Sequence, residues 1–498
     1  MTIAERLVEL TLVLAVPWRF VHALVRPSFR IAFFRELPYV VVGLAAYAAV
    51  VLGLAIAAPG ALRPLALLAV LWHVGVAWHA RAARGHRQRW PPGRLTLPSF
   101  EPLLQRWFLL GQHRRYGSPF KTRQYLRPMA CVVGLPRALD VLRTHDASLS
   151  SPPLWFGRFI PGGLMRHMPH DRHAVYRDAL RGAFSREVFA SFEPFMAARM
   201  RQELDRMADD GRRSGGRGVP PRRHLQRLMF AMWTRFFFDV DEGSEAFARL
   251  KTLSHDLDIR RPRRVSADRV RAALAETTAI VRARLDAAEE AHGVLATLAR
   301  RHPWTLTDPS ATGNVIYEMQ ITWADLSGLL QWLLRMLTDH PAWLQRLRDQ
   351  APAARSEAIS PLAARVVLET LRLEQVEHLY RATERDIEHD GMVIPRGWLV
   401  RLCLHESHRD ADVFANPDTF DPDRFLDRTY TRQEFLPFGA GRHACLGEPL
   451  SRTVGGLFVD ELARGWDWRT ITDGPVEQGS WRHWRPSSRW RVLMTARP

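Results

Sequence analysis

The sequence predicts a mainly helical protein with a small β region. Residues 190–300 follow a helical pattern with arginine-rich faces, which predicts several helices. The stretch Asn314–Asp339 is long, apolar on most faces and followed by His340-Pro341, which predicts one buried helix. Asp390-Gly391 and the run Ile394–Gly397 are strand and turn signals, which predict the β region.

The composition is that of a basic globular protein with few cysteines. The 498 residues carry a formal net charge of +18, largely from arginine. Cys131, Cys403 and Cys445 are odd in number and widely spaced, so we expect no disulfide framework and a reducing compartment. There is no nucleic-acid motif, and the arginines are not interleaved with aromatic platforms, so we expect no nucleic-acid partner. A membrane surface and an acidic protein partner explain the charge better.

The N-terminal part of the chain predicts a membrane anchor. Residues 1–36 mix apolar runs with arginines, which is typical of an amphipathic segment at the membrane interface. Residues 37–81 contain two apolar runs, 38–58 and 64–80, which predict a transmembrane hairpin. For the shorter second run, the alternative is a membrane-associated helix or a core helix.

Arginines on both sides of this hairpin predict its orientation. By the positive-inside rule, both flanks face the cytoplasm, so we expect a membrane protein with its catalytic domain on the cytoplasmic side. Residues 82–94 are basic and proline-rich, which is typical of a stiff linker. The catalytic domain is therefore predicted to span residues 95–498.

The stretch Phe435–Arg452 carries the clearest chemical signal. Cys445 follows a glycine-rich turn and precedes a helix-like run. The dipole and free N–H groups at a helix start stabilise a thiolate, which is a nucleophile or a metal ligand. The alternative is that Cys445 is a small buried apolar residue. Five positions around it form one spaced pattern: Phe438, Gly441, His443, Cys445 and Gly447.

This spacing, F-x-x-G-x-H-x-C-x-G, resembles the haem-binding loop of the cytochrome P-450 family. The resemblance implies haem b (iron protoporphyrin IX) with Cys445 as the axial ligand of the iron. It implies a mainly α protein with a small β region (α+β class), the cytochrome P-450 fold, preceded here by transmembrane helices. It also implies an external electron donor such as a ferredoxin or a flavin reductase.

The resemblance assigns roles within the loop and on an earlier helix. Phe438 would shield the sulfur, while Gly439 and Gly447 would let the backbone approach the haem. His173 and Arg177 are four residues apart on one helix face and resemble the pair that binds haem propionates. Alone, such a pair fits a solvated surface equally well. Two more residues would meet the propionates, namely Arg381 and His443, the latter standing where many members have arginine.

A further motif, Glu369-x-x-Arg372, lies on a helical run before the loop. By itself E-x-x-R is a weak signal, because the chain has other copies. The segment Phe420–Phe425 resembles the family's segment that supplies a second arginine, here Arg424. The resemblance implies a shielded Glu–Arg–Arg network with a structural role.

The central helix departs from the family pattern at its most informative place. Ile321–Asp325 lies where the family has an acid followed by threonine, but the acid position is Ala324 and the threonine position is Asp325. Either Asp325 relays protons, with Thr322 one turn away on the same face, or the ordinary oxygen-activation cycle is not used. A local role for Asp325, capping a kink or bonding the backbone, fits both.

Together these features predict a membrane-anchored haem-thiolate monooxygenase (EC 1.14 class). We expect it to hydroxylate, epoxidise or desaturate a lipophilic small molecule, using O2 and electrons from its redox partner. One alternative is a haem-thiolate peroxygenase, isomerase or dehydratase without the usual acid–threonine activation. Another is a non-catalytic haem binder or sensor.

Overall fold

The structure is a computed structural model that describes most of the chain. It describes residues 8, 10, 11, 13, 14, 37–61, 63–71, 89–95, 105–124, 127–152, 154–258, 265–286, 292–350, 359–374, 379–478 and 484–497. Most of the predicted interfacial segment 1–36, the end of the second predicted span and much of the linker 82–94 lie outside these residues. The chain divides into two compact units, Met1–Ser150 with Tyr380–Glu406, and Ser151–Leu379 with Ser407–Pro498.

The first unit contains the larger sheet. Its helices are α4 (Leu37–Ala57), η2 (Pro59–Ala61), α7 (Phe108–Tyr116), α8 (Leu135–His145) and η3 (Asp146–Ser148), and its strands are β1 (Phe120–Gln124), β2 (Arg127–Val132), β3 (Leu149–Ser150), β4 (Leu379–Thr383), β5 (Ile387–His389), β6 (Met392–Ile394) and β7 (Leu399–Leu402). Five strands pair in the order β1-β2-β7-β4-β3, with β2 parallel to β7. β5 and β6 form a hairpin whose turn is Asp390-Gly391, as the sequence predicts.

The second unit is mostly helical. Its helices are η4 (Trp155–Phe159), η5 (Met165–His167), α9 (His170–Ala183), α10 (Arg186–Ala190), α11 (Glu193–Arg213), α12 (Pro221–Phe238), α13 (Glu245–Leu253), α14 (Ala267–Asp286), α15 (Gly293–Arg301), α16 (Trp304–Thr307), α17 (Pro309–Asp339), α18 (Pro341–Asp349), α19 (Pro361–Leu373), η6 (Pro422–Phe425), η7 (Gly441–His443) and α21 (Glu448–Gly465). Its strands form two pairs, β8 (Trp466–Thr472) with β11 (Arg491–Ala496) and β9 (Glu477–Gln478) with β10 (Trp484–Arg485). The short α20 (Leu404–Ser407) spans the boundary between the units in the sequence. The predicted mainly α fold with a small β region is confirmed.

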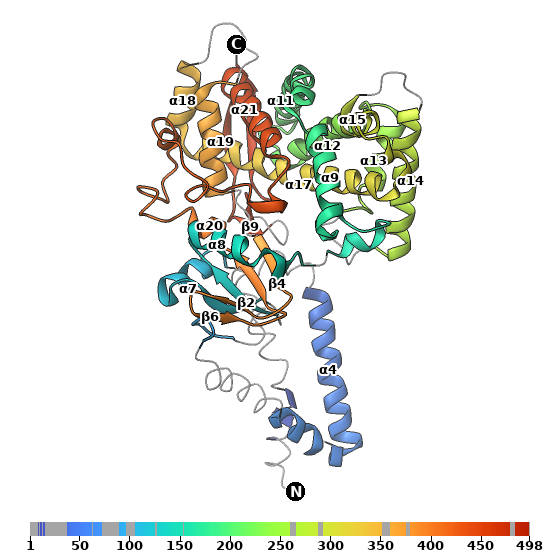
Figure 1. Ribbon diagram of the computed structural model, residues 1–498, viewed down its shortest axis with the longest axis vertical. Coiled ribbons are helices and arrows are strands. Elements are labelled where there is room, and N and C mark those ends of the chain that lie inside the picture. Colours follow the sequence, from blue (N-terminus) through green and yellow to red (C-terminus); the bar gives the residue numbers. More distant parts are fainter. Residues whose placement is uncertain are drawn as a thin grey trace. The chain divides into compact units, whose positions relative to one another are not determined.

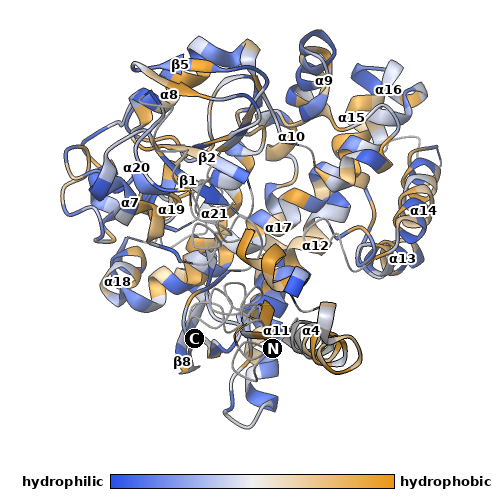
Figure 2. Ribbon diagram, turned by 90° about the horizontal axis from the view of Figure 1, so that it is seen from below, coloured by the Kyte–Doolittle hydropathy of each residue, from blue (hydrophilic) through white to orange (hydrophobic). Residues whose placement is uncertain are grey.

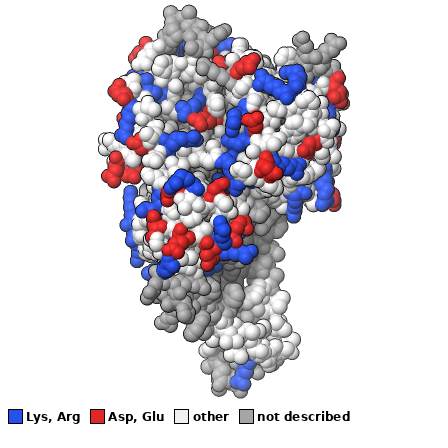
Figure 3. Space-filling view, in the orientation of Figure 1, with Lys and Arg blue, Asp and Glu red and all other residues white. Residues whose placement is uncertain are grey.

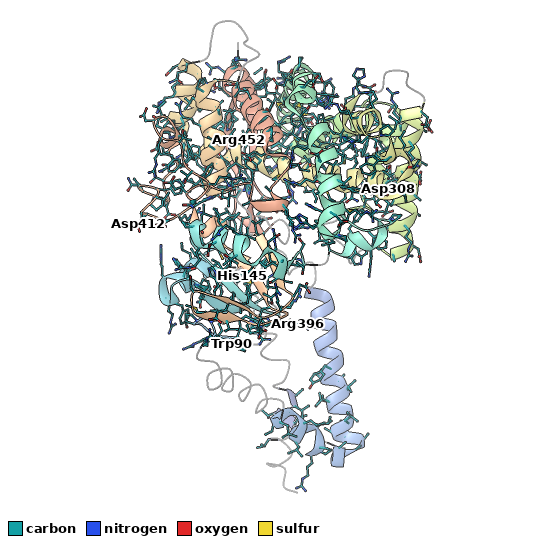
Figure 4. All side chains as sticks on the ribbon, in the orientation of Figure 1. Trp90, His145, Asp308, Arg396, Asp412 and Arg452 are labelled. Atoms are coloured by element: carbon teal, nitrogen blue, oxygen red, sulfur yellow. The ribbon has the colours of Figure 1, made fainter. Side chains whose placement is uncertain are left out.

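The central element of the second unit is the long helix α17. Asp308 caps it, because its side chain accepts a hydrogen bond from the Ser310 N–H, and Pro309 occupies the first turn (Figure 4). The helix ends at Asp339, before His340-Pro341, as predicted. It packs against α12, α19 and α21 (Figure 1). Its Trp332 is fully buried and donates to the Trp484 carbonyl at 2.8 Å, which fixes α17 against β10.

A helix, α4, forms where the first membrane span is predicted. Figure 2 shows apolar residues along it, and its Val50, Leu52 and Ile56 side chains are exposed. Among the helices that the structure describes, none combines the length and the apolar character that crossing a membrane requires. The membrane anchor therefore stays a prediction.

Basic and acidic side chains alternate over the surface seen in Figure 3. Many arginines pair with nearby carboxylates, for example Arg249 with Glu276 at 2.7 Å between Nη2 and Oε2, and Arg335 with Asp339 at 2.7 Å. Exposed pairs of this kind contribute at most about 1 kcal/mol each. They neutralise locally much of the arginine charge.

Candidate active site

The loop of residues 435–447, called the Cys loop below, places Cys445 just before α21. Gly439 and Gly441 have φ angles of 70° and 71°, a region that residues with a side chain avoid. These two residues turn the chain so that the Cys445 N–H donates to the Phe438 carbonyl at 2.9 Å. The half-buried Phe438 ring packs against the hydrophobic core. The loop therefore holds the sulfur within three residues of the helix start.

Cys445 is exposed, yet its thiol has a raised pKa. Burial raises the pKa to about 12, the Gly447 N–H bonded to the sulfur lowers it, and the carboxylates of Glu318 and Asp325 raise it further. The Gly447 N–H favours the thiolate, as the sequence predicts for the start of a helix, but burial and the carboxylates oppose it. The residue has accessible surface, but the protein groups around the sulfur favour the protonated thiol over the thiolate. A bound cation is needed to hold the thiolate, as a metal ion does.

The middle of α17 presents a partly accessible stripe within electrostatic range of the sulfur. Glu318, Ile321, Thr322 and Asp325 are half-buried, and the last three follow Glu318 at i+3, i+4 and i+7, which puts all four on one helix face. Thr322 Oγ1 donates to the Glu318 carbonyl at 2.7 Å. Ala324, the family's acid position, is buried. The only carboxyls among the described residues on this stripe are thus Glu318 and Asp325.

Glu318 is a site residue that the sequence reasoning missed. Burial raises its pKa to about 7, Arg166 lowers it, Asp325 raises it and Arg177 lowers it. It also contributes to the raised pKa of Cys445, so it lies within electrostatic range of the sulfur. Its spacing of seven residues from Asp325 was the available signal.

Cationic side chains from two other elements reach the same region. Arg177 on α9 donates to the Ala444 carbonyl at 2.7 Å, and burial lowers the pKa of its guanidinium. The His173 ring lies edge-on to His443, with 4.8 Å between ring centroids. The structure thus brings three of the four predicted propionate ligands to the Cys loop: His173, Arg177 and His443. Arg381 lies on β4 in the first unit, where its Nη1 donates to the Tyr380 carbonyl, and its role stays a prediction.

The Glu–Arg–Arg network forms and is buried. Both carboxylate oxygens of Glu369 accept from Arg372, at 2.7 and 2.8 Å, and Arg424 Nε donates to Oε1 at 2.9 Å. Glu369 and Arg372 have no exposed surface, and the Arg424 side chain is 5% exposed. Such a charge-assisted, bidentate arrangement is strong when it is shielded from water.

His408 connects this network to the Cys loop and was not identified from the sequence. Arg372 Nη1 donates to the His408 carbonyl at 2.8 Å, and His408 Nε2 accepts from the Leu436 N–H at 2.9 Å. Burial, with Arg372 and Arg409 nearby, lowers the pKa of His408 to about 3. The ring is therefore neutral and able to accept this bond. The network holds the first residues of the Cys loop through a tertiary contact.

The residues around Cys445 fit a haem. The accessible sulfur needs a cation, and two carboxyls of the α17 stripe lie within electrostatic range of it. Arg166, on η5, has a buried Nε without a hydrogen-bond partner among the described residues. A haem propionate would satisfy it, as it would Arg177. Cys445 would hold the iron, and these two arginines would hold the propionates.

Comparisons with known proteins agree with this site. The cytochrome P450 family model matches residues 326–480, which include the Glu–Arg–Arg network and the Cys loop but begin just after Asp325. Abscisic acid 8'-hydroxylase 1 of Arabidopsis thaliana is 24% identical over 412 residues, covering 76% of this chain and 86% of the relative. Cytochrome P450 26A1 of Xenopus laevis is 26% identical over 463 residues, covering 83% and 92%.

A solved structure shows the same fold. The retinoic acid-bound cyanobacterial CYP120A1 superposes with a TM-score of 0.68 at 22% sequence identity, covering 82% of this chain and 99% of that chain. The fold and the sequence matches support a cytochrome P450 monooxygenase, whose family model matches residues 326–480 of this chain.

Proposed function

We propose that this monooxygenase hydroxylates, epoxidises or desaturates a lipophilic small molecule. It uses O2 and electrons from a separate donor such as a ferredoxin or a flavin reductase. The observation that carries the proposal is the accessible Cys445 sulfur within electrostatic range of the carboxyl-bearing stripe of α17. When bound, haem b supplies a thiolate-ligated iron that activates oxygen.

The substrate class that we propose is a lipophilic carboxylic acid. The matched relatives are named for abscisic acid, and the matched structure for retinoic acid. In this chain, η4 brings apolar side chains to α17: Phe156 stacks on Tyr317 with 5.7 Å between centroids. This apolar wall suits the hydrocarbon part of such an acid.

The residues of the chain would divide the remaining tasks. The Gly447 N–H bonds the Cys445 sulfur, which spreads the charge of a thiolate. The apolar loop excludes water and orients the substrate, and the α17 stripe holds water near its carboxyls. Asp325 would hold and release a proton on this face. We infer that a carboxyl here replaces the alcohol of the ordinary motif.

We expect Asp325→Ala to lower turnover driven by a redox partner by about 10²-fold, the usual contribution of one positioned proton donor. The ferrous–CO difference spectrum should be unchanged, because Cys445 is untouched. Ser327→Ala, on the buried side of the same helix, is the control and should keep wild-type turnover. Unchanged turnover in Asp325→Ala would remove Asp325 from the mechanism. Turnover with peroxide but not with NAD(P)H and a redox partner would favour the peroxygenase alternative.

We also propose that the N-terminal helices hold the enzyme on a membrane, with its catalytic domain on the cytoplasmic side. Ile56 is 82% exposed, and Leu67 and Leu68 are each 61% exposed. Exposed apolar surface of this kind is typical of a region that contacts a membrane or another protein. In vesicle flotation, the full chain should float with the vesicles, and the double variant Ile56→Glu/Leu68→Glu should float much less. Val175→Glu, at an exposed apolar position on α9, is the matched control. Equal flotation of all three proteins would contradict the anchor.

A further inference from the structure

Glu318 is a second carboxyl on the α17 face that carries Asp325. Seven residues separate the two, which is two turns or about 10.5 Å along the helix axis. Thr322 lies between them, and its hydroxyl donates to the Glu318 carbonyl, which leaves its oxygen free to accept a bond from water. The face therefore presents acid, alcohol and acid in sequence, all partly accessible.

Ionisable groups from η5, α9, the Cys loop and α17 itself interact electrostatically with Glu318. Arg166 approaches from η5, Arg177 from α9, Cys445 from the Cys loop and Asp325 along α17 itself. Within the part of the chain that the structure describes, no ion pair joins Glu318 to either arginine. Burial without a contacting counter-ion favours the protonated carboxyl, which agrees with its raised pKa of about 7.

A structural carboxylate in the same unit looks different. Glu203 on α11 is 1% exposed, and it accepts hydrogen bonds from His224 at 2.9 Å and from Arg227 at 3.0 Å. Burial raises the pKa of Glu203, but these two partners outweigh it and lower the pKa. Glu203 is held by contacting partners that lower its pKa, whereas Glu318 is half-buried, has no ion pair among the described residues and has a raised pKa. This contrast indicates that Glu318 does not have a structural role like that of Glu203.

We propose that Glu318 and Asp325 form a two-carboxyl proton path along α17, in place of the family's acid–alcohol pair. The inference rests on the proposed function. The O–H bond of Glu318 breaks, bridging water molecules pass the proton, and an O–H bond forms on the Asp325 carboxylate. Glu318 then regains a proton from solvent. Ala324, at the family's acid position, is buried and apolar, and Glu318 is the described carboxyl that shares the partly accessible α17 face with Asp325.

The test uses the haem-loaded full chain and three variants, Glu318→Gln, Glu318→Asp and Glu448→Gln. Glu448 also raises the pKa of Cys445, but its carboxylate pairs with Arg452 at 2.8 Å on α21 (Figure 4), so it is the matched control. We expect redox-driven turnover to fall about 10²-fold in Glu318→Gln and to recover partly in Glu318→Asp. Wild-type turnover should decline as pH rises through about 7, because Glu318 then loses its proton. Glu318→Gln should lack this decline, and Glu448→Gln should keep it.

A second readout does not depend on turnover. Infrared difference spectra should show a protonated carboxyl band that titrates near pH 7, is absent in Glu318→Gln and is present in Glu448→Gln. The inference would be overturned if Glu318→Gln kept the turnover and the pH profile of the wild type. It would also be overturned if Glu318 were ionised at every pH at which the protein is folded. Absence of any redox-driven turnover in the wild-type enzyme would instead refute the proposed function, and the path with it. The ferrous–CO spectrum identifies a variant that has merely lost its haem site.

Discussion

Replacing Glu369 with glutamine is expected to destabilise the folded chain by about 3–5 kcal/mol, because it leaves two buried guanidinium groups without their carboxylate. Glu369 and Arg372 are fully buried, and Arg424 is nearly so. The substitution keeps the shape of the side chain, so the loss of stability measures the removed negative charge and not a cavity. It also replaces one of the two carboxylate oxygens that accept from Arg372 by an NH2 group, which only donates. Urea unfolding of the haem-loaded protein measures the change.

The control for this prediction is Glu448→Gln, which breaks an exposed ion pair. The side chains of Arg452 and Glu448 are 46% and 37% exposed, so the expected cost is at most about 1 kcal/mol. Because His408 ties the network to Leu436, Glu369→Gln should also loosen the Cys loop and speed the loss of haem. Equal stability of the two variants would show that the network has no structural role.

Replacing Cys445 with serine is expected to reduce redox-driven turnover to the level of a haem-free preparation. A serine hydroxyl is a far weaker donor of electron density to iron than a thiolate, and that density favours O–O cleavage. Folding should change by less than about 0.5 kcal/mol, because the residue is exposed and serine is close to cysteine in shape. Product formation and the thiolate-type ferrous–CO band measure the effect.

Cys131→Ala is the matched control for this prediction. Cys131 lies buried on β2, so its loss costs packing, but the thiolate-type band should remain. A band that survives in Cys445→Ser, or disappears in folded Cys131→Ala, would show that the axial ligand lies elsewhere.

Local sequence signals predicted the parts of the site that local chemistry determines. The helix over Asn314–Asp339 follows from its apolar faces and the following His340-Pro341, and the structure extends its start to Pro309 because Asp308 provides a cap. Glycine spacing predicted the turn before Cys445, where Gly439 and Gly441 have left-handed φ angles. The hairpin turn at Asp390-Gly391 was predicted for the same reason.

The remaining parts depend on tertiary contacts that no local pattern encodes. The half-buried state of Glu318 depends on which face of α17 borders accessible space. His408 acts through a bond to Leu436, 28 residues away. The pKa of the Cys445 thiol rises because burial and two distant α17 carboxylates outweigh the Gly447 N–H, whereas the sequence displays only the helix start.

We propose that the haem lies between the Cys445 sulfur and the carboxyl stripe of α17. A crystal structure of the haem-loaded full chain tests it directly. We expect the iron bound by the Cys445 Sγ, with Glu318 and Asp325 on the opposite side of the haem. An iron bound by His173 or His443 instead, or both carboxyls on the same side as the sulfur, would contradict the claim.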